Sequence, residues 1–224
     1  MATVHIGLLG HPVAHSLSPR MQNAAFAARG LDWDYTAHDV EDVLAGVAAL
    51  RELGFAGANV TIPHKQAVVA ACDEADGDAV NTLVFRDGRV LGFNTDQEIL
   101  AGISAERACV IGAGGAARTL APALPADTRF YSRSGEWPPD STGCDLIVNA
   151  TPVRDEVLVE LGAGQTLIDL PYPRTATADA AARNGATVLD GFDVLVSQGA
   201  KSFELWTGVA APVAVMRSAL GLPA

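Results

Sequence analysis

Ala108-Cys109-Val110-Ile111-Gly112-Ala113-Gly114-Gly115-Ala116-Ala117 leads from a short apolar run through a glycine-rich turn into a helical pattern that ends near residue 124. The apolar run predicts a buried strand, and the glycines predict a tight turn without side chains. In such a unit a pyrophosphate can approach the backbone at the positive end of the helix dipole. We expect a dinucleotide site here, although tight strand-to-helix turns elsewhere use glycine too. The expected residues are Gly112, Ala113, Gly114, Gly115 and Ala116.

Four more short strands are expected after the glycine turn, at residues 128–132, 145–149, 166–169 and 187–189. Helical patterns fall between most of them, which is typical of a parallel sheet covered by helices. The connection between residues 132 and 145 is an exception. It holds about a dozen residues with two prolines, near the lower limit for a crossover that contains a helix, so we expect a bare loop there.

The N-terminal part of the chain has its own alternation of strands and helices. Strands are expected at 4–9, at 33–39 and in a run that ends at 59–61, with helices that begin at Ser18, near Val43 and at Pro63. Ser18 is expected to be an N-cap, with Pro19 at the first helical position. Two further strands, 80–85 and 90–93, flank an Asp-Gly pair that predicts a hairpin. The sequence therefore predicts a second α/β lobe, with the boundary near 97–106.

Composition and charge exclude several classes of partner. The 224 residues include 26 acidic and 15 basic ones, a net charge of −11, which argues against nucleic acid and against an anionic membrane surface. No apolar run approaches the ~18 residues that cross a bilayer. The first residues lack the basic segment of a signal peptide, and three well-separated cysteines indicate reduced thiols. A small-molecule ligand and a cytoplasmic location are expected.

Two charged residues after strands are candidates for chemistry. Lys65 is expected in the first turn of a helix, where the helix dipole repels a cation, so its presence favours a functional role over that of a surface lysine. Asp96 is either a functional carboxylate or a helix cap. Ser16 and Ser18 are open to a similar alternative, as a turn residue and a cap.

The residues after the second strand of the glycine-turn lobe bear on the cofactor. NAD sites usually place Asp or Glu there to accept from the ribose 2′-hydroxyl. This chain has Ser132, Arg133 and Ser134, which suit a 2′-phosphate, although Arg133 could be a solvated surface residue. The five histidines are not spaced as metal ligands, because Pro12 breaks any helix between His11 and His15. We expect no metal.

Seven segments together resemble the shikimate dehydrogenase family, in the order of that family and over essentially the whole chain. They are 10–19 (GHPVAHSLSP), 59–65 (NVTIPHK), 79–82 (AVNT), 94–96 (NTD), the glycine turn, 148–151 (VNAT), and 191–208 with Gln198, Phe203 and Trp206. Each segment alone is weak, but their order makes the resemblance specific.

The resemblance implies a shikimate site and a catalytic pair. Lys65 would transfer the proton, assisted by Asp96. The polar residues around a polyhydroxylated cyclohexene carboxylate would be Ser16, Ser18, Thr61, Asn81, Tyr172 and Gln198. Such a fan of short polar groups rejects analogues by leaving buried partners unpaired. NADP would bind the glycine turn, with Ser132, Arg133, Ser134, Leu170 and Gly191.

The implied architecture is two α/β lobes with a cleft between them. Residues 1–96 and 198–224 would form the substrate domain, and 97–197 a Rossmann-like NADP-binding domain. The implied reaction is the reversible NADP-dependent reduction of 3-dehydroshikimate to shikimate in aromatic amino acid biosynthesis, by a monomer or homodimer. Full-length members are longer, and this chain has Gln97 where the family usually has glycine soon after Asn-Thr-Asp. The alternatives are an NAD-dependent quinate/shikimate dehydrogenase and a non-catalytic relative that only binds such a ligand.

Overall fold

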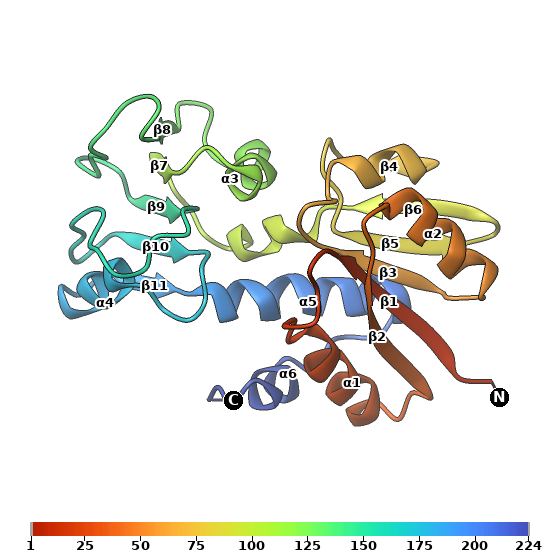
Figure 1. The fold of residues 1–224 in the computed structure, drawn as a ribbon. Coiled ribbons are helices and arrows are strands. Elements are labelled where there is room, and N and C mark those ends of the chain that lie inside the picture. Colours follow the sequence, from red (N-terminus) through yellow and green to blue (C-terminus); the bar gives the residue numbers. More distant parts are fainter. Residues whose placement is uncertain (1, 224) are drawn as a thin grey trace. The chain divides into compact units, whose positions relative to one another are not determined.

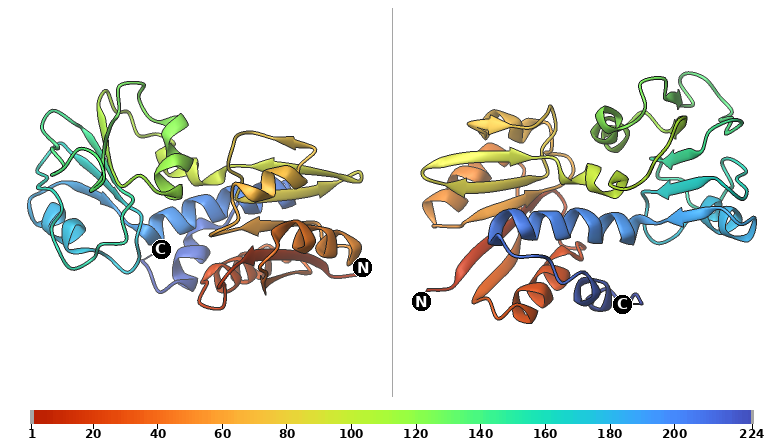
Figure 2. Two further views of the ribbon diagram at one scale, coloured as in Figure 1. Left: turned by 45° about the horizontal axis from the view of Figure 1, so that its top comes forward. Right: turned by 180° about the vertical axis from the view of Figure 1, so that it is seen from behind.

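The computed structural model describes residues 2–223, which fold as two compact units. The first unit runs to Asp96 and resumes at Val196, and the second is Gln97–Leu195. Each unit has its own sheet (Figures 1 and 2). The mixed α/β class with parallel sheets is as predicted. No helix formed by the described residues is long and apolar enough to span a membrane.

The sheet of the first unit has six strands in the order β2-β1-β3-β5-β6-β4. Their bounds are β1 Val4–Gly10, β2 Trp33–Asp39, β3 Gly57–Val60, β4 Glu74–Ala75, β5 Thr82–Arg86 and β6 Arg89–Phe93. Strand β1 pairs in parallel with β2 and β3, whereas β5 is antiparallel to both β3 and β6. The predicted hairpin joins β5 to β6 through Asp87 and Gly88, whose φ angles of +52° and +75° are those of a tight two-residue turn.

The first unit contains four of the α-helices, one of them in part. Their bounds are α1 Ser18–Ala28, α2 Val43–Glu52, α6 Val213–Ala219 and most of α5, Gly191–Thr207. On α2, Val43, Val47 and Leu50 are buried at helical spacing against the sheet. The Asp42 carboxylate accepts from the amides of Leu44 and Ala45 and so caps this helix.

Two expectations for the helices of this unit were wrong. Ser18 is the first residue of α1 and not its cap; its amide donates to Ser16 Oγ at 3.3 Å. The helix expected from Pro63 is a turn followed by the short 3-10 helix η1, Ala67–Ala71. The Lys65 carbonyl accepts from Val80 N at 2.8 Å, so it is not available to an α-helical partner four residues on.

The second unit has a five-stranded sheet in the order β11-β10-β9-β7-β8, and every strand pair is parallel. The strands are β7 Ala108–Ile111, β8 Arg129–Tyr131, β9 Leu146–Asn149, β10 Thr166–Asp169 and β11 Thr187–Leu189. Helix α3, Gly115–Leu120, follows the glycine turn and continues into the 3-10 helix η3, Ala121–Ala123. Helix α4, Ala176–Arg183, connects β10 to β11.

Two crossovers in the second unit contain no helix. Residues 132–145, all of them described, form the bare loop that the sequence predicts. The β9-to-β10 connection, also fully described, likewise has neither helix nor strand. In its place Leu158, Val159 and Leu161 pack as irregular chain into the core with Ile147 and Leu167. Loop side chains therefore cover this face of the sheet where a helix would otherwise do so.

Candidate functional site

The strand directions of the first unit bring several polar residues to one edge of its sheet. Strand β3 and strand β6 run the same way, with β5 antiparallel between them. Residues that follow β3, precede β5 or follow β6 therefore lie at the same edge. Lys65 follows β3, Asn81 precedes β5 and Asp96 follows β6, in the 3-10 helix η2, Thr95–Leu100.

Lys65, Asp96 and Asn81 are joined by direct hydrogen bonds. Lys65 Nζ donates to Asp96 Oδ2 at 2.5 Å, and Asn81 Nδ2 donates to Asp96 Oδ1 at 2.8 Å. The Lys65 and Asp96 side chains are 26% and 15% exposed, so the pair is largely buried but open at one side. Such a charged pair in a lowered dielectric interacts more strongly than a surface pair and can position a proton donor.

The other substrate candidates of the first unit lie near this edge or on α5. Ser16 and Ser18 lie on the connection from β1, a strand parallel to β3, and at the start of α1. The Thr61 amide donates to Leu9 O at 2.9 Å, which fixes the residue beside the end of β1. Gln198 lies on α5, and its carbonyl accepts from Ser202 Oγ at 2.9 Å.

An ion pair braces the connection that carries Ser16. His11 Nδ1 lies 2.5 Å from Asp39 Oδ1, and Asp39 Oδ2 accepts from Val13 N at 3.3 Å. The hydrogen bond to Asp39 raises the pKa of His11, and the same bond lowers the pKa of Asp39. Asp39 was not singled out from the sequence, because its partner lies 28 positions away.

The glycine turn of the second unit leaves its backbone open. Gly112 has φ +116°, and a side-chain carbon there would lie 2.9 Å from the Ala150 carbonyl oxygen, so only glycine fits. Gly114 and Gly115 have nothing within 4 Å of the corresponding position. Ala113 and Ala116 lie between and beside these glycines. The turn thus has the uncovered backbone that a pyrophosphate requires.

The residues expected to bind a 2′-phosphate follow β8, and one of them, Arg133, already forms an ion pair within the protein. Arg133 Nη2 donates to Glu156 Oε1 at 2.9 Å, and both side chains are more than half exposed. The guanidinium also lies 5.6 Å from the centre of the Trp137 ring. Ser132 Oγ and Ser134 Oγ are 3.3 Å apart. Glu156 competes with any anion for Arg133.

Leu170, Tyr172 and Gly191 lie together in the second unit. A side-chain carbon at Gly191 would be 2.6 Å from Leu170 O, so the start of α5 packs directly on this backbone. The Tyr172 and Phe192 rings are 5.5 Å apart. Asp169, which ends β10, accepts from Asn149 Nδ2 at 2.7 Å and anchors the segment, while burial raises the pKa of its carboxyl.

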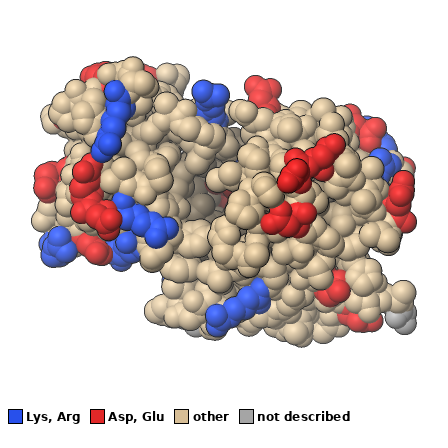
Figure 3. Space-filling view, viewed as in Figure 1, with Lys and Arg blue, Asp and Glu red and all other residues tan. Residues whose placement is uncertain are grey.

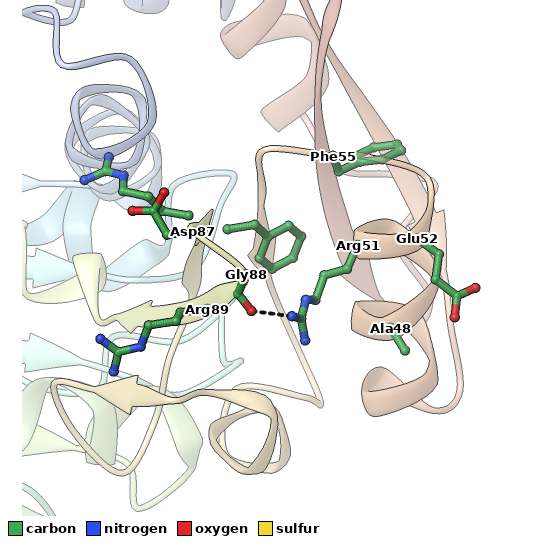
Figure 4. Close-up of a pocket in the computed structure, with 9 residues that line it drawn as sticks. Ala48, Arg51, Glu52, Phe55, Asp87, Gly88 and Arg89 are labelled. Carbon is green, nitrogen blue, oxygen red and sulfur yellow. Dashed lines mark hydrogen bonds between the residues drawn. The ribbon is translucent and has the colours of Figure 1, made fainter.

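A separate hollow in the first unit is not a good ligand site. It measures about 470 Å³ and lies between α2 and the tip of the β5–β6 hairpin, at the opposite end of β5 from Asn81 (Figure 4). Arg51 donates to Gly88 O at 2.6 Å, and Arg89 is paired with Glu74. These cations are committed to the protein itself.

On the face of the molecule in Figure 3, basic and acidic side chains are mixed in the left part, whereas acidic ones predominate in the right part. Among residues 2–223, no cluster of three His, Cys, Asp or Glu side chains could hold a metal ion.

Two family models match the chain. The model described as the shikimate dehydrogenase substrate binding domain matches residues 8–83, and that described as the shikimate 5′-dehydrogenase C-terminal domain matches residues 191–220. A shikimate dehydrogenase (NADP+) of Methanopyrus kandleri is 38% identical over 272 aligned positions, covering 96% of this chain and 94% of that protein. Because the alignment is longer than the 224 residues here, that relative contains internal residues that this chain lacks, as expected.

Two solved structures have the same fold. The shikimate 5-dehydrogenase of Thermus thermophilus, in complex with NADP(H) and shikimate, has a TM-score of 0.83 at 31% identity, covering 96% of this chain and 98% of that one. The ligand-free 5-ketofructose reductase of a Gluconobacter species has a TM-score of 0.88 at 26% identity, covering 99% of both. The fold and the glycine turn place this chain in the class of two-domain dehydrogenases that use a dinucleotide cofactor. The chain belongs to the shikimate dehydrogenase family.

Several residues around the site were missed from the sequence. Asn59, Thr82 and Thr95 lie inside the segments that carry the resemblance but were given no role, and Ser202 lies on α5 one turn after Gln198. All four are buried and hydrogen-bonded to one another. A buried strand position filled by Asn or Thr was the available signal, since such side chains need buried partners.

Proposed function

We propose that this chain catalyses the reversible NADP-dependent reduction of 3-dehydroshikimate to shikimate. The observation that carries the proposal is the largely buried Lys65–Asp96 pair at the sheet edge, with Asn81 bonded to the same carboxylate. This arrangement fits an alcohol–ketone interconversion, which needs one proton donor beside the oxygen that gains or loses its proton.

Residues of the first unit would have different roles in binding the substrate and in transferring the proton. The Lys65 ammonium would donate its proton to the carbonyl oxygen as the ketone is reduced, and would take it back in the reverse direction. Asp96 accepts from Lys65 and so fixes the direction in which Nζ points. Asn81 and Asp96 would bind the reacting hydroxyl and its neighbour. The remaining polar groups of this unit, from Ser16, Ser18, Thr61 and Gln198, would bind the carboxylate and the other hydroxyls.

NADP would bind the second unit and, when bound, supplies or accepts the hydride. The uncovered backbone at Gly114 and Gly115 fits its pyrophosphate. Arg133 would bind the 2′-phosphate, with Ser132 and Ser134 beside it. This needs Arg133 to exchange its contact with Glu156 for the phosphate, which weakens the preference for NADP(H) without removing it.

An assay of the purified protein tests the proposal. Reduced nicotinamide is followed by its absorbance with shikimate, quinate and 5-ketofructose as substrates, each with NADP(H) and NAD(H). The proposal requires shikimate with NADP to give the highest kcat/KM. Preference for quinate with NAD would identify the alternative dehydrogenase. Ligand binding without turnover by any pair would identify a non-catalytic relative.

Location and assembly belong to the same proposal. Cys72, Cys109 and Cys144 are free thiols, and the last two are buried, which supports a reducing, cytoplasmic environment. We infer a monomer or homodimer that acts on small molecules and does not bind nucleic acid. Size-exclusion chromatography with light scattering checks the assembly.

A further inference from the structure

A line of buried polar side chains begins at Tyr35 and ends at the Asp96 carboxylate. Tyr35 is 1% exposed, and its hydroxyl donates to Asn59 Oδ1 at 2.8 Å. Burial raises the pKa of Tyr35, so this hydroxyl keeps its proton and acts as a donor. Because Asn59 Oδ1 accepts from Tyr35, the Asn59 amide nitrogen faces the other way, toward β5.

The Asn59 amide nitrogen reaches two hydroxyl groups. Nδ2 lies 2.9 Å from Thr82 Oγ1 and 3.0 Å from Ser202 Oγ, and 3.0 Å from the carbonyl oxygen of Asn81. An amide nitrogen can only donate, and its two hydrogens are shared among these three oxygens, so the two hydroxyl groups accept from it and direct their own protons elsewhere. Ser202 directs its proton to Gln198 O, one turn back on α5.

The hydroxyls next fix the orientation of the Asn81 amide. Asn81 Oδ1 accepts from Thr82 Oγ1 at 3.1 Å, Thr95 Oγ1 at 3.0 Å and the Thr95 amide at 2.8 Å. Because the Thr95 amide can only donate, the Asn81 oxygen has to face Thr95, and the Asn81 nitrogen is left to face Asp96. The reversed amide would set an oxygen against the Asp96 carboxylate and its own hydrogens against those of Thr95. Only one orientation of the Asn81 amide therefore forms hydrogen bonds both with Thr95 and with Asp96.

We propose that Tyr35, Asn59, Thr82, Thr95 and Ser202 are positioning residues for the reaction, which hold the Asn81 amide toward Asp96 and thereby hold the carboxylate on Lys65. The proposal rests on the function proposed above. The donors of Tyr35, Asn59, Thr82 and Asn81 follow one another toward the carboxylate, and hydrogen bonds aligned in this way polarise and strengthen one another.

The pattern of burial supports a role in positioning. Lys65 and Asp96 are partly exposed, whereas Asn59, Asn81, Thr82, Thr95 and Ser202 are at most 5% exposed. Burying so many polar groups has a desolvation cost that apolar side chains of similar size would not have. A fully satisfied polar network fixes one geometry, which is what a catalytic pair at its end requires.

Thr82 offers the cleanest test, because it touches Asn59, Asn81, Thr95 and Ser202. Thr82→Val keeps the shape and removes the hydroxyl, whereas Thr82→Ser keeps the hydroxyl. We expect Thr82→Val to lower kcat with shikimate by roughly tenfold or more, with little change in KM, because a misplaced proton donor slows the chemical step. Thr82→Ser should restore most of the rate. Thr177→Val is the control, since Thr177 is equally buried but lies on α4 of the second unit.

A second readout does not depend on activity. The chain has only two lysines, Lys65 and Lys201. Their relative rates of modification by trinitrobenzenesulfonate can be measured by peptide mass spectrometry, with Lys201 as the internal reference. If the network holds Asp96 on Lys65, Thr82→Val should raise the modification of Lys65 relative to Lys201, and Thr82→Ser and Thr177→Val should not.

The outcomes separate this proposal from the proposed function. A loss of kcat in Thr82→Val, restored in Thr82→Ser, together with faster Lys65 modification, supports the positioning role. Unchanged kcat and Lys65 reactivity in Thr82→Val, with only a lower Tm, overturns it. Equal losses in the Val and Ser variants also overturn it, because the cause is then packing. A wild-type protein inactive toward shikimate refutes the proposed function, and the lysine modification then still tests the network.

Discussion

Lys65 Nζ lies 2.5 Å from Asp96 Oδ2, although the two residues are 31 positions apart and follow different strands. Their contact depends on β3 and β6 running in the same direction with β5 between them. The second carboxylate oxygen of Asp96 is taken by Asn81. One carboxylate therefore orients both an ammonium and an amide.

Replacing Lys65 by methionine should abolish most turnover and leave the fold intact. Methionine fills most of the space of the lysine side chain, so no large cavity forms, while the loss of the proton donor should lower kcat by ~10²–10⁴-fold. Steady-state kinetics and circular dichroism measure the two effects. A variant that kept more than about a tenth of the wild-type kcat would remove Lys65 from the proposed chemistry.

Asp96→Asn should also be severe, because it removes the charge that holds Lys65 while keeping the size of the side chain. We expect kcat to fall by ~10²-fold or more, in the range of general acid–base groups. The competing interpretation is that Asp96 only stabilises the start of η2. In that case the variant would melt at a lower temperature and retain its kcat.

Substituting alanine for Gly112 or for Gly114 in the glycine turn should have different effects on the stability of the protein. Gly112→Ala should destabilise the protein by more than about 1 kcal/mol, since its φ of +116° is strained for alanine and the methyl would meet Ala150 O. Gly114→Ala should leave Tm nearly unchanged, because its φ is −77° and the methyl would meet no protein atom within 4 Å.

The same Gly114 methyl would stand where the pyrophosphate is expected, so KM for NADPH should rise in Gly114→Ala. Thermal unfolding and kinetics on the two variants separate folding from cofactor binding. An unaltered KM for NADPH in Gly114→Ala would place the dinucleotide elsewhere.

Arg133 and Glu156 should have opposite effects on cofactor choice. Arg133→Ala should raise KM for NADPH by roughly ten- to a hundredfold, the worth of one charge-assisted contact, and leave NADH use nearly unchanged. Glu156→Gln should lower KM for NADPH, because it releases Arg133 from its 2.9 Å ion pair. Equal losses with both cofactors in Arg133→Ala would show that the residue only supports its loop.

The His11–Asp39 pair should make stability depend on pH. The pKa of His11 is raised above 6.5 in the folded protein, so its contribution is complete below about pH 6.5 and is lost as the pH rises through the raised value. The pKa of Asp39 is lowered below 3.8, so its contribution is present above that pH and is lost as the pH falls through the lowered value.

The Tm difference between wild type and His11→Ala should therefore be largest between about pH 4 and pH 6.5 and shrink above it. His15→Ala is the matched control on the same connection. A Tm difference that stayed constant from pH 5 to about pH 9 would mean that the ion pair does not form.

The local sequence pattern determined much of the secondary structure of this protein. The alternation of apolar runs and capping or turn residues predicted most strands, the Asp87-Gly88 hairpin and the helix after the glycine turn, because these depend on neighbours in sequence. The bare loop after β8 followed from its length and its prolines. The candidate residues came from short motifs in a fixed order.

Tertiary structure decided what those residues touch. Lys65 lies in a turn and not in a helix, because its carbonyl bonds to Val80 on a distant segment. Arg133 is paired with Glu156, 23 positions away, and Asn81 takes its orientation from Thr95 and from α5 through Ser202. Periodicity reports which face of an element is apolar, but partners brought together by strand order and register leave no trace in the local sequence. The geometry of the site is for that reason a property of the folded sheet.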